Sequence, residues 1–238
     1  MDAHIDTRGQ AKYAHVIVPM CIANYSDWKK NEAEFQEFAD KLHGLVIEMQ
    51  AQHPDGWLID LRGNGGGNMW PMLAGIGPVV GEGMLGSFEN SEGQSDSWFY
   101  RAGKAGTRSQ DGKEEFDAEV LTPPSVFDNL PWVAVLLDRG TASSGEAVAV
   151  SFAGRARERS FGEHTAGFST SNHMFQLSDG AALFLCTAIE MDRNGKRYQD
   201  GIDPDVKLPA PVARPIEGDD SVIQAAINWI ASSTKSSR

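Results

Sequence analysis

A long amphipathic stretch between two short apolar segments is the feature that most constrains the fold of this 238-residue chain. Residues 15–20 and 57–60 each read as a short apolar strand. Between them, apolar side chains recur every three or four residues, at Phe35, Phe38, Leu42, Leu45, Val46 and Met49. That spacing places them on one face of a helix. A strand–helix–strand order with a helix of this length connects parallel strands, so we expect a largely parallel sheet.

The remaining segments predict further elements of the same domain. These are a buried strand at 133–137, a short helix at 144–152, a hairpin at 175–190 around Asp179-Gly180 and a final helix near 220–231. Residues 86–120 are rich in glycine, serine and charge, and we interpret them as a β-rich insertion. The expected fold is therefore one α/β domain over residues 1–238, with helices flanking a mostly parallel sheet.

The charge balance excludes some classes of partner. Lys and Arg total 21 against 33 for Asp and Glu, which gives a formal net charge of −12. Nucleic acids and anionic membranes require clustered basic residues, so we expect neither as a partner. No apolar run approaches the length of a membrane span, and the first residues contain no signal peptide. No Cys-x-x-Cys or Cys/His metal spacing occurs, so neither a metal nor a cofactor is expected.

Two segments carry candidate chemistry at the ends of predicted strands. The first runs from Asp60 to Asn68 and contains three consecutive glycines, whose amides can approach a ligand and donate to a developing oxyanion. A tight turn in which Asp60 pairs with Arg62 is the structural alternative. The second begins a helix at Ser143 and Ser144, where helix amides stabilise negative charge, as a serine nucleophile requires. Simple N-capping by either serine is the alternative there.

A third segment, residues 161–170, combines a histidine, a glutamate and two glycines. His164 in this loop is a conceivable general base, although a loop histidine is usually just solvated. Taken in order, the three segments resemble the tail-specific, or C-terminal processing, serine protease family. The matching motifs are Asp-Leu-Arg-x-Asn-x-Gly at 60–66, Ser-Ser-Gly-Glu at 143–146, Gly-Glu-His-Thr-Ala-Gly at 162–167 and Gly-Ile-Asp-Pro-Asp at 201–205.

The resemblance is strongest to the nisin-resistance-protein branch, through residues 67–72, 141–144 and 165–170. It implies a ClpP/crotonase-type core with Ser143 as the nucleophile. It also implies an oxyanion hole formed by the backbone amides of Ser144 and of Gly66 or Gly67. Asn68, Met69, Trp70 and Phe168 are the candidate substrate-binding residues.

The resemblance leaves the general base open. The best-known members use a lysine where this chain has Phe168, and the nisin-resistance branch uses a histidine from a segment before the first core strand. Here only His4 and His15 lie in or before that strand. We therefore consider His4, His15, His164 and a partner segment as sources of the base. The motifs begin close to the first residue, so we expect a core that lacks an N-terminal cap segment.

Two functions follow from this reading. The first is a serine hydrolase that cleaves peptide or ester bonds through an acyl-enzyme on Ser143. The second is a non-catalytic scaffold of the same fold that binds peptides and lacks its base. The resemblance implies a location outside the cytoplasm, and the cytoplasm is the alternative. The oligomeric state is not specified by the sequence.

Overall fold

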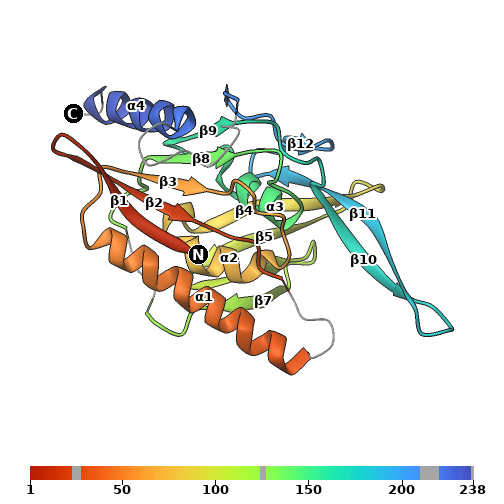
Figure 1. Ribbon diagram of the computed structural model, residues 1–238. Helices are drawn as coiled ribbons and strands as arrows, with labels where there is room; N and C mark the ends of the chain where they lie inside the picture. Colours follow the sequence, from red (N-terminus) through yellow and green to blue (C-terminus); the bar gives the residue numbers. More distant parts are fainter. Residues whose placement is uncertain (23–27, 124–126, 210–219, 237–238) are drawn as a thin grey trace.

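A computed structural model describes residues 1–22, 28–123, 127–209 and 220–236 and shows a mixed α/β fold with two sheets (Figure 1). The first sheet has the order β1-β2-β3-β8-β9-β13. Strand β1 is antiparallel to β2, and every other neighbouring pair is parallel, which confirms the expected parallel sheet. Its strands are β1 (Asp2–Arg8), β2 (Ala11–Ile17), β3 (Gly56–Asp60), β8 (Val133–Leu137), β9 (Glu158–Gly162) and β13 (Val206–Lys207).

Helices cover both faces of this sheet. They are α1 (Trp28–Gln50), α2 (Met69–Val80), α3 (Ser144–Phe152) and α4 (Ser221–Ser236). Side chains alternate across the strands: in β8, Val133 and Val135 join the core formed with α1, α2 and α3, whereas Ala134 and Leu136 pack with α4. Figure 1 shows α4 over one face and α1 under the other. The described helices include none that is long and apolar enough to cross a membrane.

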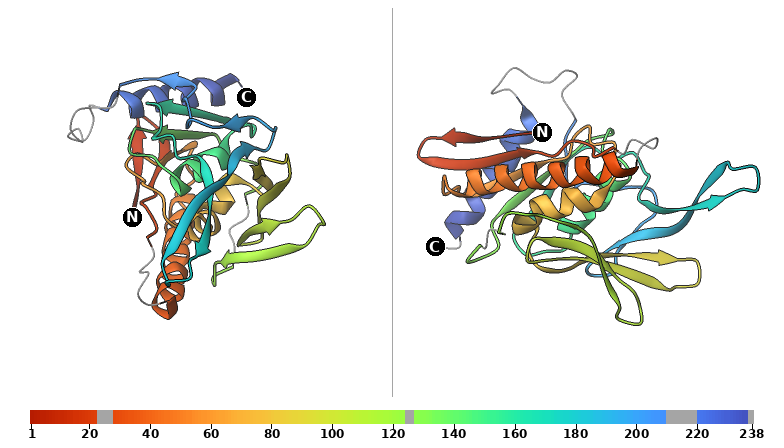
Figure 2. Two further views of the ribbon diagram at one scale, coloured as in Figure 1. Left: turned by 90° about the vertical axis from the view of Figure 1, so that its right-hand side faces the viewer. Right: turned by 90° about the horizontal axis from the view of Figure 1, so that it is seen from below.

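The second sheet is antiparallel and larger than the sequence indicated. The predicted insertion at 86–120 forms four of its strands, but the sheet also recruits the later hairpin, because β11 pairs with β4. That hairpin, β10–β11, was expected at 175–190 and projects from the body of the molecule as an arm (Figure 2). The strands are β4 (Gly83–Asn90), β5 (Ser95–Arg101), β6 (Lys104–Arg108), β7 (Glu114–Glu119), β10 (Thr170–Gln176), β11 (Ala182–Asp192) and β12 (Arg197–Tyr198).

The pairing of β3 with β8 positions the two candidate segments. Asp60 at the end of β3 is the register partner of Leu136 near the end of β8, and the two strands run parallel. The loops that follow them therefore leave the same edge of the sheet side by side. Sites of α/β folds occur at this carboxyl edge.

Candidate active site

Ser143 occupies a strained turn between β8 and α3. Its backbone has φ 52° and ψ −124°, a conformation that glycine adopts readily and serine does not. Ser143 is also the N-cap residue of α3, and the Glu146 carboxylate accepts from its amide at 2.8 Å in a capping box, so the predicted capping role and the strained turn coincide at this residue. The neighbouring hydroxyl of Ser144 donates to the carbonyl of Gly67 at 2.6 Å. The geometry therefore presents Ser143, and not Ser144, as the available hydroxyl.

The glycine-rich loop is held directly against this turn. Gly66 has φ 99°, and a Cβ added there would lie 2.8 Å from the Cβ of Ser143 and 2.8 Å from the carbonyl oxygen of Ala142. The buried side chain of Asn64 fixes the loop by accepting from the amide of Gly66 at 3.0 Å and donating to the carbonyl of Val18 at 3.0 Å. Only glycine allows so close an approach between the two segments.

Two backbone amides beside Ser143 are available to a ligand. Among the described residues, no hydrogen bond uses the amide of Gly67 or that of Ser144. The amide of Gly66, in contrast, already donates to Asn64. Of the two glycines that the resemblance offered for an oxyanion hole, Gly67 is therefore the one with a free donor.

Glu146 joins the third motif to the nucleophile turn. It is fully buried, and its carboxylate accepts from the amides of Ser143 at 2.8 Å, Gly167 at 3.0 Å and Phe168 at 2.8 Å, and from the hydroxyl of Thr165. Four donors satisfy this acceptor-only group. The carboxylate of Glu146 thus links residues 165–168 to the turn at Ser143 through hydrogen bonds.

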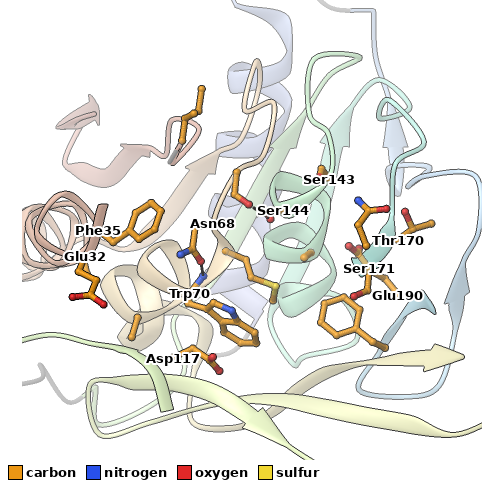
Figure 3. Close-up of a pocket in the computed structure, with 18 of the residues that line it drawn as sticks. Glu32, Phe35, Asn68, Trp70, Asp117, Ser143, Ser144, Thr170, Ser171 and Glu190 are labelled. Carbon is orange, nitrogen blue, oxygen red and sulfur yellow. Dashed lines mark hydrogen bonds between the residues drawn. The ribbon is translucent and has the colours of Figure 1, made fainter. Parts of the chain in front are cut away.

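A pocket of about 890 Å³ opens beside Ser143. Three of the four predicted substrate-binding residues line it, namely Asn68, Met69 and Trp70. Figure 3 shows Asn68 and Trp70 on one side of this pocket and Thr170, Ser171 and Glu190 on the other. The other lining residues are Ile22, Glu32, Phe35, Gln36, Ala39, Gly67, Phe88, Asp117, Ala118, Glu119, Ser143, Ser144, Ala147, Asn172 and Phe184.

The fourth predicted binding residue, Phe168, does not line this pocket. Its side chain is 63% exposed. Because the amide of Phe168 donates to the buried carboxylate of Glu146, the backbone turns inward here and the side chain is left at the surface. The structure therefore does not place Phe168 with the other predicted binding residues.

His15 and His4 lie on the opposite face of the first sheet from the pocket. His15 alternates with Ala14 and Val16, which pack toward α1 and α2, so it shares the α4 face with Tyr13. Its Nε2 is 3.2 Å from Asp60 Oδ2, and its Nδ1 is 3.4 Å from Asp6 Oδ2. His4 is the register partner of His15.

The charge state of His15 also disfavours a role as base. Burial lowers the pKa of His15, but hydrogen bonding and charge from Asp6 and Asp60 outweigh burial and raise it to about 9. The imidazole is then protonated at neutral pH and has no free nitrogen to accept a proton from Ser143.

Asp60 and Arg62 form the structural pair that the turn alternative anticipated. Arg62 donates from Nε to Asp60 Oδ1 at 2.9 Å and from Nη2 to Asp60 Oδ2 at 2.6 Å. Its Nη1 donates to Asp220, which precedes α4, at 2.6 Å. Burial raises the pKa of Asp60, but Arg62 and His15 lower it to about 2. This network anchors the start of the glycine loop without entering the pocket.

His164 is also engaged away from the pocket. Its Nδ1 lies 3.1 Å from Asp203 Oδ1, and its Nε2 lies 2.8 Å from the carbonyl oxygen of Asp200. Both ring nitrogens therefore contact the surface segment 200–203, which lies far along the chain from the loop of His164. The described residues of the pocket lining include no histidine and no lysine.

Glu190 is a pocket residue that sequence reasoning overlooked. It lies in β11, is 1% exposed, and its Oε2 has no hydrogen-bond partner among the described residues. Burial, and then the negative charge of Glu146, raise the pKa of Glu190 well above its usual range. No sequence signal marks it, because the hairpin joins the second sheet only through long-range pairing.

A serine at a strained strand-to-helix turn, held against a glycine loop with unused amides, is an arrangement that serine hydrolases share. A family model described as Peptidase family S41 matches residues 22–208, and the chain belongs to this family.

Particular relatives confirm the expected resemblance. The chain is 25% identical over 236 residues to the nisin-resistance protein of Lactococcus lactis subsp. lactis, an alignment that covers 97% of this chain and 67% of that protein. It is 27% identical over 179 residues to the carboxyl-terminal-processing protease of Synechocystis sp., which covers 75% of this chain and 36% of that protein. A solved lipoprotein from Streptococcus agalactiae shares the fold, with a TM-score of 0.69 at 23% identity over 97% of this chain and 70% of that one.

Proposed function

We propose that this chain is the catalytic core of a serine peptidase that acts through an acyl-enzyme on Ser143. The observation that carries the proposal is the strained turn at Ser143, held against Gly66 with two unused amides beside it. Strain of this kind persists where the surrounding structure imposes it, and it is concentrated at functional sites. We also assign the core to the ClpP/crotonase type, on the basis of the motif order and the parallel sheet.

In this proposal the Ser143 oxygen attacks the carbonyl carbon of the substrate. The carbonyl oxygen becomes an oxyanion that accepts hydrogen bonds from the amides of Gly67 and Ser144. The tetrahedral intermediate then collapses, the amine or alcohol leaves with the proton that the Ser143 hydroxyl gave up, and an ester remains on Ser143. Water hydrolyses this ester and restores the hydroxyl. The pocket that includes Asn68, Met69 and Trp70 receives the substrate chain.

The absence of histidine and lysine from the described pocket lining bears on the choice of substrate. General-base help accounts for about 10²–10⁴-fold of the rate in enzymes of this kind. A serine with oxyanion support alone acts best on substrates with good leaving groups, since these need little proton transfer. Activated esters are therefore the substrates that best match the described residues, and peptides require a base from elsewhere.

The same lining favours a second candidate function, a peptide-binding scaffold without catalysis. A fluorophosphonate probe and a p-nitrophenyl ester separate the two functions. The hydrolase predicts covalent labelling of the wild-type chain, loss of labelling and esterase activity in Ser143→Ala, and retained labelling in Ser144→Ala. The scaffold predicts peptide binding with no labelling of any form. Equal labelling of wild type and Ser143→Ala would remove Ser143 from the mechanism.

A further inference from the structure

The hairpin of β1 and β2 gathers three metal-ligating side chains on one face of the first sheet. His4 in β1 is the register partner of His15 in β2, and their rings lie 4.8 Å apart between centroids. Asp6 follows His4 by two residues in the same strand, so it points to the same face. Strand pairing therefore creates a cluster of two imidazoles and a carboxylate from residues eleven positions apart in the sequence.

The two distances from Asp6 to the histidines are close to those of a tetrahedral zinc site. Asp6 Oδ2 lies 3.4 Å from His15 Nδ1 and 3.7 Å from His4 Nε2, and one ligand atom from each of the three residues lies within 4.8 Å of the others. With bonds of 2.0–2.1 Å, neighbouring ligand atoms of tetrahedral Zn²⁺ are about 3.4 Å apart. His4 is a half-exposed side chain, so the proposal requires its ring to rotate toward Asp6 and His15.

Two of the ligand atoms, Asp6 Oδ2 and His15 Nδ1, form a buried ion pair 3.4 Å apart. Asp6 Oδ2 and His15 Nδ1 are inaccessible to solvent, and neither makes a hydrogen bond with the described residues. His15 is only 4% exposed. Because this ion pair lacks the geometry of a hydrogen bond, it is a place where a divalent cation can replace the proton of His15 and bind both atoms. A divalent cation satisfies both atoms at once.

The second coordination shell is already in place. The other ring nitrogen of His15, Nε2, lies 3.2 Å from Asp60 Oδ2. A metal-ligating histidine commonly holds a carboxylate in this way, which fixes the tautomer and the orientation of the ring. Asp60 is fixed in turn by Arg62. The ring of His15 is therefore oriented so that Nδ1 faces the cluster.

We propose that His4, Asp6 and His15 bind one Zn²⁺ ion, with water as the fourth ligand. Two histidines and one carboxylate are an established donor set for zinc. The half-exposed His4 provides the entry path. The bound ion pins the edge strand β1 to β2 and, through His15 and Asp60, to β3. This site lies on the α4 face, away from the pocket at Ser143, so it is a structural site.

The test is a zinc titration of the untagged, chelator-treated chain by isothermal calorimetry, with Co²⁺ as a spectroscopic probe. We expect one Zn²⁺ per chain, tetrahedral Co²⁺ absorption bands, and a rise in Tm on zinc addition. His4→Ala and Asp6→Asn should each weaken binding at least tenfold. Both are more accessible than His15, and circular dichroism checks that they remain folded.

The matched control is His164→Ala, which removes another histidine paired with a carboxylate, Asp203, outside the cluster. Its zinc affinity should equal that of the wild type. The proposal is overturned if the wild type binds no zinc, or if folded His4→Ala and Asp6→Asn bind it as tightly as the wild type. If the wild type binds no zinc, the cluster is an ion pair in which the His15 imidazolium is held between Asp6 and Asp60.

Discussion

Ser143 carries backbone strain that a substitution can measure. Its φ of 52° and ψ of −124° favour glycine over every residue with a Cβ. Ser143→Gly should therefore be more stable than Ser143→Ala by about 1 kcal/mol, because alanine keeps the strain and glycine releases it. Both variants lack the nucleophile and should be inactive. Urea denaturation of the two variants measures the difference, and an alanine variant as stable as the glycine variant would contradict the strained turn.

Glu190 makes the stability of the fold depend on pH. Its folded-state pKa is raised by burial and by the charge of Glu146, whereas the unfolded chain has the ordinary value of 4.5. Below that value both states are protonated and stability is complete. Above it the unfolded state loses the proton that the folded state keeps, so stability falls with rising pH, by at most about 1.4 kcal/mol per unit.

Glu190→Gln should remove this dependence, because the amide stays neutral at every pH. We expect the free energy of unfolding of the wild type to fall more steeply between pH 5 and pH 8 than that of the variant. Chemical denaturation at several pH values measures both profiles. Glu92→Gln, on an exposed turn between β4 and β5, is the control and should follow the wild type. Parallel profiles for wild type and Glu190→Gln would show that the carboxyl is ionised in the folded state.

At the level of elements, the loop after β3 approaches the Ser143 turn closely at one glycine, and a substitution tests the proposed role of that contact. In Gly66→Ala the new Cβ would lie 2.8 Å from both the Ser143 Cβ and the Ala142 carbonyl oxygen, so the loop must move away from the nucleophile. Loss of one oxyanion donor costs about 10²–10³-fold in rate. We therefore expect fluorophosphonate labelling to slow by about 100-fold.

Gly63→Ala is the matched control for this substitution. Gly63 lies in the same loop with φ 71°, but a Cβ there has no neighbour within 4 Å. The control variant therefore carries backbone strain without the clash and should label at close to the wild-type rate. If both variants slow equally, strain in the loop, and not the contact with Ser143, accounts for the effect.

Elements with a local signal were predicted from the sequence, and those that depend on long-range pairing were not. The apolar stripe of α1 and the buried runs of β3 and β8 are local patterns, and the parallel sheet followed from them. The partnership of β11 with β4 has no local signal, and neither does the pairing that aligns His4 with His15. For that reason the extent of the second sheet, the position of Glu190 and the histidine–aspartate cluster became visible only in the structure.

The candidate site divides in the same way. The family resemblance implied that Ser143 and the glycine loop lie together, and the structure shows that the two segments follow neighbouring parallel strands. Because side chains alternate along β2, His15 lies on the face that α4 covers. His164 contacts Asp203 at the surface. The face of the sheet on which a strand residue lies depends on how the strand pairs with its neighbouring strands. The sequence pattern alone therefore did not separate the candidate bases.

At the scale of the whole molecule, the chain has an excess of acidic residues, and the pocket beside Ser143 shares this excess. The net charge is −12. Besides the buried Glu190, the described lining of the pocket contains Glu32, Asp117 and Glu119, and no lysine or arginine. Clefts lined by charge of one sign concentrate ligands of the opposite sign and accelerate their association. If the proposed hydrolase activity is present, the pocket should favour substrates that carry lysine or arginine side chains.

This preference should be sensitive to salt. For a lysine-containing p-nitrophenyl ester, kcat/KM should fall about tenfold as ionic strength rises from about 0.01 M to about 1 M, because the Debye length shrinks from about 30 Å to about 3 Å. A neutral ester of similar size should change little over the same range. Asp117→Asn combined with Glu119→Gln should flatten the salt dependence for the cationic ester, since both carboxylates line the pocket. Identical salt profiles for the two esters would mean that the field of the chain does not reach the nucleophile, and substrate choice would then rest on shape and apolar contacts with Trp70 and Phe35.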